Sequence, residues 1–595
     1  MKKLCALMLS GLLILGLAGC GDQSKTPAQL STANAIADGT YAGEGNGRGG
    51  IIGVEVTIKD DTITAITITK NDETAGIDKA MDTLTEAILA TNSVDQDAVS
   101  GATATSNGFL EAVNNALAAA GASKEMLKKI DAGTPESTER TAKEETHDVV
   151  VIGAGGAGFA AAITAKMNGA DVIIVEKMPM AGGNTLISGA EYAAPGNWLQ
   201  AAEGIEDSAE LMAQDMLTGG DHLNDPELVK VVADNALAGA EWLRDTCNVV
   251  WEDELMFFGG HSVKRSLIPL GASGAEIIKK EQAKAEELGI PLLLDTRATE
   301  LITDETGRVI GVKAEGKNTD YTFTAKNVIL TTGGFGSNIE MRKQYDPQID
   351  ESILSTNSVG STGDGITMAT KVGANLVGME YIQTYPICDP TTGALLYYDD
   401  ARLYGYTVIV NKEGKRFVEE LGRRDVMSMA IKDQTGHVCY ELVDQNGFDL
   451  SKLQENHAAE LDYLTQAGLM VKADTLEEAA NFFGIDAEEL KKTVENYNSY
   501  VEAGVDPEFN KRSMPAKIET GPYYIVKAAP AVHHTMGGVQ INANAQVINQ
   551  DGNVIEGLYA AGEVTGGIHG TNRLGSDALA DITVFGRIAG ENASK

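Results

Sequence analysis

Two adjacent aspartates, Asp399 and Asp400, follow two tyrosines in the stretch LLYYDDAR. Because neighbouring carboxylates repel each other, a nearby group should use at least one of them. Three roles fit this pattern: an exposed turn, a metal site, or one wall of a binding pocket. The elements that surround the pair must decide between them.

A glycine turn with a nucleotide-binding pattern lies far upstream, in HDVVVIGAGGAGFAAAITAKMNGADVIIVEK. Gly153, Gly155 and Gly158 separate an apolar strand from an Ala-rich helix, and Glu176 ends the next apolar strand. Glycines at this spacing let backbone N–H groups approach a pyrophosphate, and the acid can accept a hydrogen bond from a ribose hydroxyl. The alternative is a tight strand–helix turn without a ligand. The turn alone does not separate NAD from FAD.

Length and charge restrict the class of protein. A chain of 595 residues predicts two to four domains, and 43% hydrophobic with 22% charged residues is typical of a folded protein. The formal net charge of −38 argues against a nucleic-acid partner, because such partners require a basic face.

The first twenty residues, MKKLCALMLSGLLILGLAGC, have the pattern of an export signal. Lys2 and Lys3 precede an apolar run that is too short for a stable membrane span. The ending LAGC resembles a bacterial lipobox with Cys20 as the lipidated residue; the alternative is an ordinary cleaved signal peptide. Either pattern predicts an exported protein, and lipidation would anchor it to the outer face of the cell membrane.

Cysteine spacing excludes several cofactors. Apart from the N-terminal segment, the chain has Cys247, Cys388 and Cys439, none at metal-ligand spacing and none in a Cys-x-x-Cys-His motif. A covalent c-type haem, a cysteine-ligated iron–sulfur cluster and a disulfide scaffold are therefore not expected. No metal site is predicted.

The pattern along the chain predicts an α/β fold: a Rossmann-like domain, interrupted by an α+β capping domain and preceded by a small α+β domain. Residues 54–70 alternate around Lys59-Asp60-Asp61 and predict a β-hairpin, followed by helices near 78–90 and 107–120. Strands are also expected at 327–334 and 557–564. The expected boundaries are a signal peptide at 1–20, a tether at 21–37, the small domain at 38–121, a linker at 122–146, the Rossmann-like domain at 147–377 and 532–595, and the capping domain at 378–531.

The motifs MAGGNT (180–185), TGDG (362–365), HHTMGG (533–538) and AGEVTGGIHGTNRLGSDAL (561–579) resemble the FAD-dependent fumarate reductase/succinate dehydrogenase flavoproteins, in their soluble single-chain branch. The resemblance covers about 147–595. It implies FAD, held without a covalent bond because no histidine stands near the GGNT position. Besides the glycine turn and Glu176, the FAD-binding residues it implies are Asn184, Thr185, His534, Glu563, Ala578 and Leu579.

The small N-terminal domain contains DAVSGAT (97–103), which resembles the motif of FMN-binding domains. In those domains a flavin transferase esterifies FMN through its phosphate to the last threonine, which is Thr103 here. The alternative is a Ser/Thr-rich turn that caps the helix expected at 107–120. With two flavins and no haem motif, the resemblance implies an electron relay from a membrane donor through FMN to FAD.

The resemblance also implies an active centre that reduces the C=C bond of a 2-enoic acid. His533 and Arg573 correspond to residues that grip the substrate carboxylate, and hydride comes from FAD N5. In GKRFVEELGRRD, the position of the proton donor falls on Arg424. Arginine is an unusual acid unless burial lowers its pKa. The alternative for Arg424 is an ion pair with Glu419, Glu420 or Asp425.

The other end of the pocket departs from fumarate reductases, because Tyr385 and Asp400 replace a histidine and a member of a Thr-Glu pair. Such a pocket disfavours a second carboxylate and favours an N–H donor. Tyr385 and Asp400 are similar to the pocket of urocanate reductases, with Glu191 and Phe258 as further expected walls. Asp399 is expected to support Asp400 or to be solvated. Leu403 replaces the family's relay arginine, although Arg402 is adjacent.

Urocanate, an imidazole acrylate, meets this description and is the expected substrate. Another 2-enoate, such as a hydroxycinnamate or fumarate, is the first alternative. A non-catalytic flavin electron-carrier lipoprotein is the second, although such a carrier needs no carboxylate clamp beside an acid.

Overall fold

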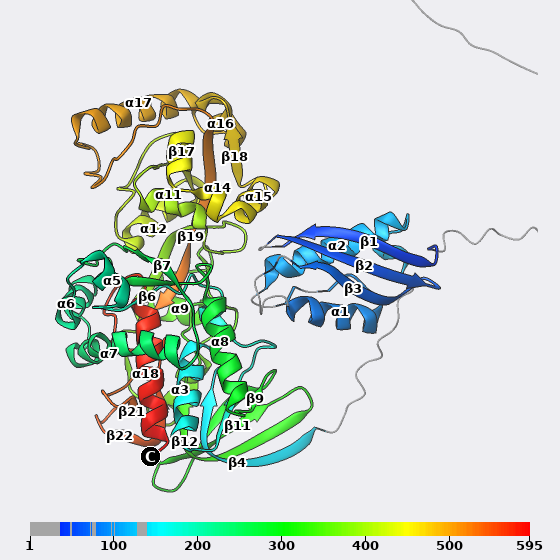
Figure 1. The fold of residues 1–595 in the computed structure, drawn as a ribbon, viewed down its shortest axis with the longest axis vertical. Helices are drawn as coiled ribbons and strands as arrows, with labels where there is room; N and C mark the ends of the chain where they lie inside the picture. Colours follow the sequence, from blue (N-terminus) through cyan, green and yellow to red (C-terminus); the bar gives the residue numbers. More distant parts are fainter. Residues whose placement is uncertain are drawn as a thin grey trace, which may run out of the picture.

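The computed structural model describes residues 36–47, 50–71, 73, 79–96, 98–99, 102–127 and 140–595. Cys20, most of the expected tether, and Asp97, Ser100 and Gly101 of the FMN motif lie outside the described residues, as does the side chain of Thr103. The described chain forms the expected three parts (Figure 1).

The N-terminal domain packs two helices on a three-stranded antiparallel sheet. Asp60 and Asp61 both have positive φ and form the turn of the predicted hairpin. In the first strand, Gly43 and Gly45 allow the second helix to approach the sheet, because a Cβ on either would lie 2.1 Å from a helix carbonyl oxygen. The elements are β1 (Gly39–Asn46), β2 (Ile51–Lys59), β3 (Thr62–Asn71), α1 (Lys79–Thr91), α2 (Thr103–Ala119) and η1 (Lys124–Met126).

The FAD-type domain is built on a sheet with the strand order β10-β11-β12-β4-β5-β9, in which β22 also pairs with β12. The two distant strand predictions are confirmed: Val328 lies opposite Leu558 in a parallel pair. The elements are β4 (Thr141–Ile152), α3 (Gly156–Met167), β5 (Val172–Val175), α4 (Gly183–Leu186), β6 (Tyr192–Ala193), α5 (Trp198–Glu203), α6 (Ala209–Gly219), α7 (Pro226–Asp245), β7 (Trp251–Met256), β8 (Ser266–Pro269), α8 (Gly274–Glu287), β9 (Leu292–Leu293), β10 (Arg297–Thr303), β11 (Val309–Glu315), β12 (Thr319–Leu330), α9 (Ile339–Tyr345), α10 (Asp364–Lys371), β14 (Leu376–Val377), β20 (Gly538–Gln540), β21 (Gln546–Ile548), β22 (Val554–Ala560), β23 (Thr565–Gly566) and α18 (Asp577–Ala593).

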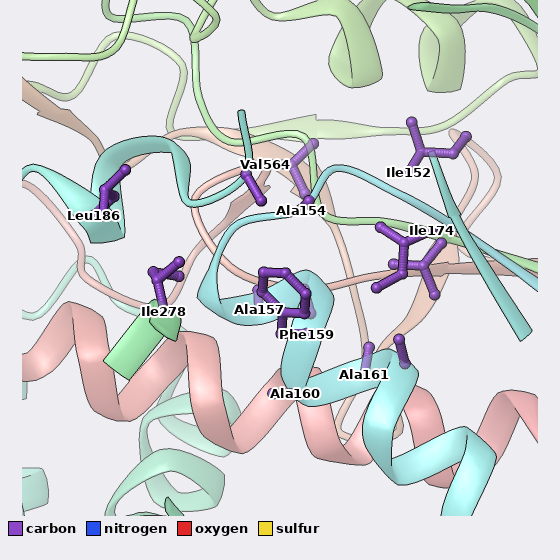
Figure 2. Packing of buried hydrophobic residues seen from close by; sticks show 14 of the residues in the cluster. Ile152, Ala154, Ala157, Phe159, Ala160, Ala161, Ile174, Leu186, Ile278 and Val564 are labelled. Carbon is purple, nitrogen blue, oxygen red and sulfur yellow. The ribbon is translucent and has the colours of Figure 1, made fainter. Parts of the chain in front are cut away.

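Helix α3 begins at the glycine turn and packs against α18 through small residues. A Cβ on Gly590 would lie 2.2 Å from the Ala161 carbonyl oxygen, so only glycine permits this approach. Figure 2 shows Ala157, Ala160 and Ala161 along α3, with the α18 ribbon crossing behind them. This close packing fixes the glycine turn, at one end of α3, relative to the C-terminal helix.

The capping domain surrounds the long strand β19, which pairs with β13, β15, β17 and β18. Strand β19 continues through the expected boundary at 531 and ends among the FAD-domain elements (Figure 1). The remaining elements are β13 (Leu354–Ser355), β15 (Ile382–Cys388), η2 (Tyr397–Asp399), α11 (Asp400–Leu403), β16 (Val408–Val410), α12 (Arg424–Lys432), η3 (Thr435–His437), β17 (Cys439–Asp444), α13 (Gln445–Leu450), α14 (Leu453–Asn456), α15 (Ala458–Gln466), β18 (Met470–Ala473), α16 (Leu476–Phe483), α17 (Ala487–Ala503) and β19 (Tyr523–Thr535).

Strands β12 and β22 begin at Thr319 and Val554, before the expected 327 and 557, and β4 and α2 also begin earlier than the sequence pattern predicts. Strand β4 starts at Thr141, inside the expected linker, because its polar and largely exposed first half already pairs in parallel with the first half of β12. Helix α2 starts at Thr103 instead of 107.

Within the described ranges, no helix combines the length and apolar character needed to cross a membrane. The same residues contain no group of three or more His, Cys, Asp or Glu side chains that could hold a metal ion. Cys247, Cys388 and Cys439 are buried and form no disulfide.

Candidate active site

The glycine turn after β4 fits a nucleotide. Gly153 has φ of 106°, and a Cβ on Gly158 would lie 1.9 Å from the Gly153 carbonyl oxygen, so the turn itself requires both glycines. Gly155 is different, because its φ is −83° and its nearest protein neighbour would be 3.8 Å from an added Cβ. The protein does not need a glycine at 155, whereas a pyrophosphate approaching the N-terminus of α3 would.

Glu176 follows β5 and turns back to this loop. Its carboxylate accepts hydrogen bonds from the backbone N–H groups of Ala154 and Met178, each at 2.8 Å. Burial raises the pKa of Glu176, and these N–H groups oppose that rise. The acid therefore lies beside the glycine turn, where the sequence predicts a ribose contact.

Asn184 and Glu563 form a second polar cluster from distant parts of the chain. Asn184 Nδ2 donates to Glu563 Oε2 at 3.1 Å, while Glu563 Oε1 accepts from the backbone N–H and hydroxyl of Thr535 at 3.0 and 3.1 Å. Thr185 Oγ1 accepts a bond from the N–H of Gly156 at 3.3 Å, which ties this cluster to the glycine turn. Three of the predicted FAD residues thus converge.

The difference between two glycines gives a test of the cofactor site. Gly155→Ala should lose FAD but keep the Tm of the wild-type apoprotein, because the added methyl occupies space that only the ligand uses. Gly158→Ala should lower Tm, because its Cβ overlaps a backbone oxygen. Flavin absorbance per protein and thermal unfolding measure both effects. Normal FAD content in Gly155→Ala would contradict the assignment.

His533 and His534 are consecutive residues of β19 but lie beside different groups, Thr356 and Glu563. The pairing shifts between Gln383↔His534 and Thr384↔Val532, so His533 is the extra residue of a bulge, which re-aims its side chain. His533 Nδ1 lies 3.0 Å from Thr356 Oγ1, and its ring is 5.4 Å from the ring of Tyr385. Burial, and then the charges of Arg573 and Arg424, lower the pKa of His533 well below its usual value, so the ring is neutral.

His534 lies on the side of the Asn184–Glu563 cluster. Its Nδ1 is 3.9 Å from Glu563 Oε1, and its ring is edge-on to His569 at 5.5 Å. Burial lowers the pKa of His534 well below its usual value. The two histidines therefore lie in different surroundings. His534 is beside the predicted FAD residues, whereas His533 is beside the predicted substrate residues.

Arg424 and Arg573 converge from two domains. Arg573 is 7% exposed; burial, and then the charge of Arg424, lower its pKa to about 10. Its Nη1 donates to the Leu574 carbonyl oxygen at 3.1 Å, and its Nε has no hydrogen-bond partner among the described residues. Burial lowers the pKa of Arg424 as well. Two neighbouring cations, Arg573 buried and Arg424 partly buried, make a site for an anion.

The ion pairs proposed as an alternative for Arg424 are not formed. Glu419 pairs with Arg512, Glu420 with Arg416, and Asp425 with Arg423. Among the described residues, the Arg424 guanidinium lies over the face of the Tyr385 ring, 4.8 Å from its centroid. The side chain is therefore held in place without a carboxylate partner.

Tyr385 is fixed by a buried chain of polar groups. Its hydroxyl donates to Asp399 Oδ2 at 2.6 Å, and Arg402 binds both oxygens of that carboxylate, at 2.5 and 2.6 Å. Arg402 also donates to the Glu420 carbonyl oxygen at 2.8 Å. Asp399 is 1% exposed, so the expectations that it is solvated or part of an exposed turn are wrong. Charge neutralisation by Arg402 explains how it can be buried.

Asp400, in contrast, is partly exposed and points elsewhere. Its Oδ2 is 2.9 Å from His457 Nε2, and the His457 ring stacks on Tyr397 with centroids 5.4 Å apart. Sequence reasoning missed His457, because a single histidine before the helical pattern of α15 carries no signal of its role. The sequence shows Arg402 next to Leu403 but does not indicate that Arg402 forms an ion pair. Its partner is Asp399 rather than Asp400.

Glu191 and Phe258 lie at the edge of the same site. Burial raises the pKa of Glu191, Asp400 raises it further, and Arg424 and Arg573 lower it. Those interactions put Glu191 within electrostatic range of all three side chains. Phe258 packs on Gly575, where an added Cβ would lie 2.3 Å from its ring. It therefore covers the loop that carries Arg573.

The N-termini of two helices mark the remaining cofactor predictions. Helix α18 begins at Asp577, after Ser576 with φ of 68°, so the backbone N–H groups of Ala578 and Leu579 lie in its first turn. Thr103 is the first residue of α2, and Ala102 occupies the N-cap position without a side-chain hydrogen bond. The Ser/Thr-rich turn named as an alternative falls on Ser100 and on the side chain of Thr103, which lie outside the described residues. A helix N-terminus favours a phosphate.

Two protein families match the chain. The family described as FAD binding domain matches residues 148–579, and the FMN-binding domain matches residues 47–118. Urocanate reductase from Eggerthella lenta is 47% identical over 584 residues, covering 98% of this chain and 96% of that protein. Fumarate reductase (cytochrome) from Shewanella frigidimarina is 40% identical over 458 residues, covering 76% of this chain and 78% of that protein.

A solved structure supports the same fold. The open conformation of a flavocytochrome c3 fumarate reductase aligns with a TM-score of 0.68 and 40% identity, over 76% of this chain and 78% of that one. These relatives and the two flavin domains establish a flavin-dependent oxidoreductase that acts on CH–CH groups and reduces the C=C bond of enoates. The chain therefore belongs to the FAD-dependent fumarate reductase/succinate dehydrogenase flavoprotein family, in the branch with an N-terminal FMN-binding domain.

Proposed function

We propose that the substrate is urocanate and the product imidazolepropionate. The observation that carries this proposal is the contrast between the two ends of the site. Arg573, which is buried, and Arg424, which is partly buried, are cations without a carboxylate ion pair in the described chain, whereas Asp400 and Tyr385 offer acceptor oxygens. An enoate with a carboxylate at one end and an N–H group at the other matches both ends. The 47% identity to a urocanate reductase supports the same choice.

Arg573 and His533 bind the carboxylate in this proposal. An arginine fork pairs with both carboxylate oxygens, and neutral His533 can donate one further hydrogen bond. These donors also stabilise the negative charge that develops on the carboxylate as the C=C bond is reduced. FAD, held by the glycine turn, Glu176 and the Asn184–Glu563 cluster, supplies a hydride for the β carbon when it is bound.

Arg424 gives the proton to the α carbon. An ordinary guanidinium is too weak an acid for this role, but burial and the charge of Arg402 lower the pKa of Arg424. The Tyr385 ring lies against the guanidinium, and the Asp399–Arg402 pair holds Tyr385 in place. Arg402 and Asp399 therefore act as positioning residues for the acid.

The imidazole ring occupies the end formed by Tyr385 and Asp400. Because the Tyr385 hydroxyl already gives its proton to Asp399, its oxygen is left to accept a bond, and Asp400 is an acceptor too. An imidazole N–H can donate a hydrogen bond to one of these oxygens. Fumarate would bring a second carboxylate against acceptors and negative charge, with no hydrogen to donate.

FMN on Thr103 would pass electrons from a membrane donor to FAD, after attachment by a flavin transferase. The start of α2 favours the phosphoester there. Thr103→Ala should lose FMN that survives denaturation while keeping FAD. Its turnover with a chemically reduced dye should persist, because small dyes reduce FAD directly. Denaturing gels under ultraviolet light detect the attached flavin, and fluorescence retained in Thr103→Ala would contradict the assignment.

Export and lipid anchoring through Cys20 belong to the same proposal. They rest on the sequence MKKLCALMLSGLLILGLAGC and place the enzyme where a membrane donor can reach FMN. Fractionation of cells that produce the full chain should recover it with the membranes. Recovery from the cytoplasm would overturn this part of the proposal.

Product analysis tests the reaction itself. Anaerobic incubation of the flavin-loaded chain with urocanate and a reduced viologen dye should yield imidazolepropionate, two hydrogens heavier than the substrate. The same incubation with fumarate should yield little succinate. Unchanged urocanate beside rapid succinate formation would overturn the proposal and favour a fumarate reductase.

A further inference from the structure

The two arginines of the candidate site belong to different domains. Arg424 begins α12 of the capping domain, whereas Arg573 lies in the loop before α18 of the FAD domain. Their guanidiniums repel each other, since the charge of Arg424 lowers the pKa of Arg573. Despite this repulsion, contacts made by neighbouring residues connect the two chain segments.

Arg423, the neighbour of Arg424, makes such a contact across the domains. Its Nη1 lies 2.9 Å from both Oδ1 and Oδ2 of Asp221, which follows α6 of the FAD domain. On its other side Arg423 binds Asp425 within α12, at 3.1 and 3.0 Å. One guanidinium thus joins a contact within the helix to a contact between domains.

Asp221 also binds the segment that carries Arg573. Thr571 donates its hydroxyl to Asp221 Oδ2, and the Thr571 N–H donates to the Gly220 carbonyl oxygen at 3.2 Å. Gln383 of β15 fixes the next residues, donating to Asn572 Oδ1 and to the Arg573 carbonyl oxygen, both at 2.8 Å. A single carboxylate therefore contacts a residue adjacent to Arg424 and a residue two positions before Arg573.

The backbone at Asp221 is unusual. Asp221 and His222 both have φ of 56°, a left-handed conformation that non-glycine residues seldom adopt in succession. Side chains 39% and 46% exposed, such as those of Arg423 and Asp221, contribute little to stability through an ion pair. Neither the strained turn at Asp221 nor its exposed ion pair adds much to the stability of the fold. The contact is better explained by the positions in which it holds the two chain segments.

We propose that Asp221 is a positioning residue that sets the separation between Arg424 and Arg573 through Arg423 and Thr571. This inference rests on the proposed function, in which both arginines act on one substrate. The contact between Asp221 and Arg423 determines how well the proton donor, Arg424, aligns with the carboxylate bound by Arg573. Misplacement of a reacting group by about 1 Å can lower a rate by roughly 100-fold.

The variant Asp221→Asn tests the inference, with Asp425→Asn as the matched control. Asp221→Asn keeps the size of the side chain and removes the charge that binds Arg423 across the domains. Asp425→Asn removes the other partner of the same guanidinium, within α12. We expect kcat to fall between about 5- and 100-fold in Asp221→Asn. In Asp425→Asn it should stay within about twofold, because a surface ion pair contributes little.

A double-mutant cycle separates this role from general damage. If Asp221 acts through Arg423, then Asp221→Asn combined with Arg423→Gln should be no slower than the worse single variant. Flavin content and Tm should be unchanged throughout, and wild-type turnover should fall with added salt more than turnover of Asp221→Asn. Additive losses in the double variant, or full kcat in Asp221→Asn, would overturn the inference.

These outcomes are independent of the identity of the substrate. Any enoate that the wild-type enzyme reduces, including fumarate, can be used to measure the effect of Asp221→Asn. Failure of the wild-type enzyme to reduce urocanate would overturn the proposed substrate alone. Normal turnover of Asp221→Asn beside active wild-type enzyme would overturn the positioning role alone.

Discussion

Arg424→Gln should lower kcat by about 10²- to 10⁴-fold, the range expected when a general acid is removed. Glutamine keeps a polar side chain against the Tyr385 ring but cannot supply a proton to a carbanion. The fall should appear with every enoate that the enzyme reduces, because the acid serves the common α carbon. Steady-state oxidation of a reduced viologen dye measures it.

Arg512→Gln is the matched control for this loss of an arginine. Arg512 lies in the capping domain, pairs with Glu419, and has a side chain that is 62% exposed. Its removal should leave kcat within about twofold, since exposed ion pairs contribute little. Both variants should retain FAD. Equal kcat in Arg424→Gln and the wild-type enzyme would exclude Arg424 as the proton donor.

The pH dependence follows from Arg573. Its guanidinium must be protonated to bind a carboxylate, and its pKa is lowered to about 10. The value of kcat/KM should therefore be retained below this pKa and lost as pH rises through about 10. His533 is already neutral near neutral pH, so it should add no inflection between about pH 6 and 8. A loss of kcat/KM centred near neutrality, also seen with an enoate that has no imidazole, would contradict these roles.

Asp400→Ala should change the preference between substrates more than the rate of the chemical step. Loss of a hydrogen bond between the imidazole N–H and a carboxylate costs about 1.5–3 kcal/mol, or roughly 10- to 150-fold in kcat/KM for urocanate. Fumarate makes no such bond, and removing the negative charge lowers the repulsion against it. Its kcat/KM should stay constant or rise.

Asp462→Ala provides the matched control for Asp400→Ala. Asp462 is an exposed residue of α15, the helix that follows His457, so its removal alters the local charge without touching the site. The urocanate-to-fumarate ratio of kcat/KM should be unchanged in this variant. A parallel loss for both substrates in Asp400→Ala would indicate that Asp400 supports the fold rather than the choice of substrate.

Local patterns predicted the parts of the site that lie close together in sequence. The glycine turn, Glu176 and the strands around them follow from apolar runs and glycine spacing within one βαβ unit, because each constraint acts over a few residues. The hairpin around Asp60 and Asp61 was predictable for the same reason.

The roles of the adjacent aspartates depend on contacts that sequence spacing does not encode. Arg402, three residues after Asp399, pairs with Asp399 because η2 and α11 follow each other with one continuous helical turn. His457 reaches Asp400 from a distant segment of the capping domain. The two aspartates therefore differ in their surroundings: Asp399 is buried in an ion pair, whereas Asp400 is partly exposed and lies beside His457.

The cross-domain contacts were equally unpredictable. Asp221 meets Arg423 and Thr571 only because the capping and FAD domains pack together, and no periodicity links these three positions. The bulge that aims His533 likewise depends on the register between β15 and β19. Long-range packing, rather than local propensity, determines these parts of the site.

The most direct test of the proposed substrate is a competition between enoates. Urocanate, fumarate and a hydroxycinnamate are mixed at equal concentration with the flavin-loaded wild-type chain and limiting reduced dye under anaerobic conditions. The ratio of their initial depletion rates equals the ratio of their kcat/KM values. The proposal predicts that urocanate is consumed first, with the other two largely unchanged. Depletion of fumarate at the same rate or faster would contradict the assignment of Tyr385 and Asp400 to an N–H donor.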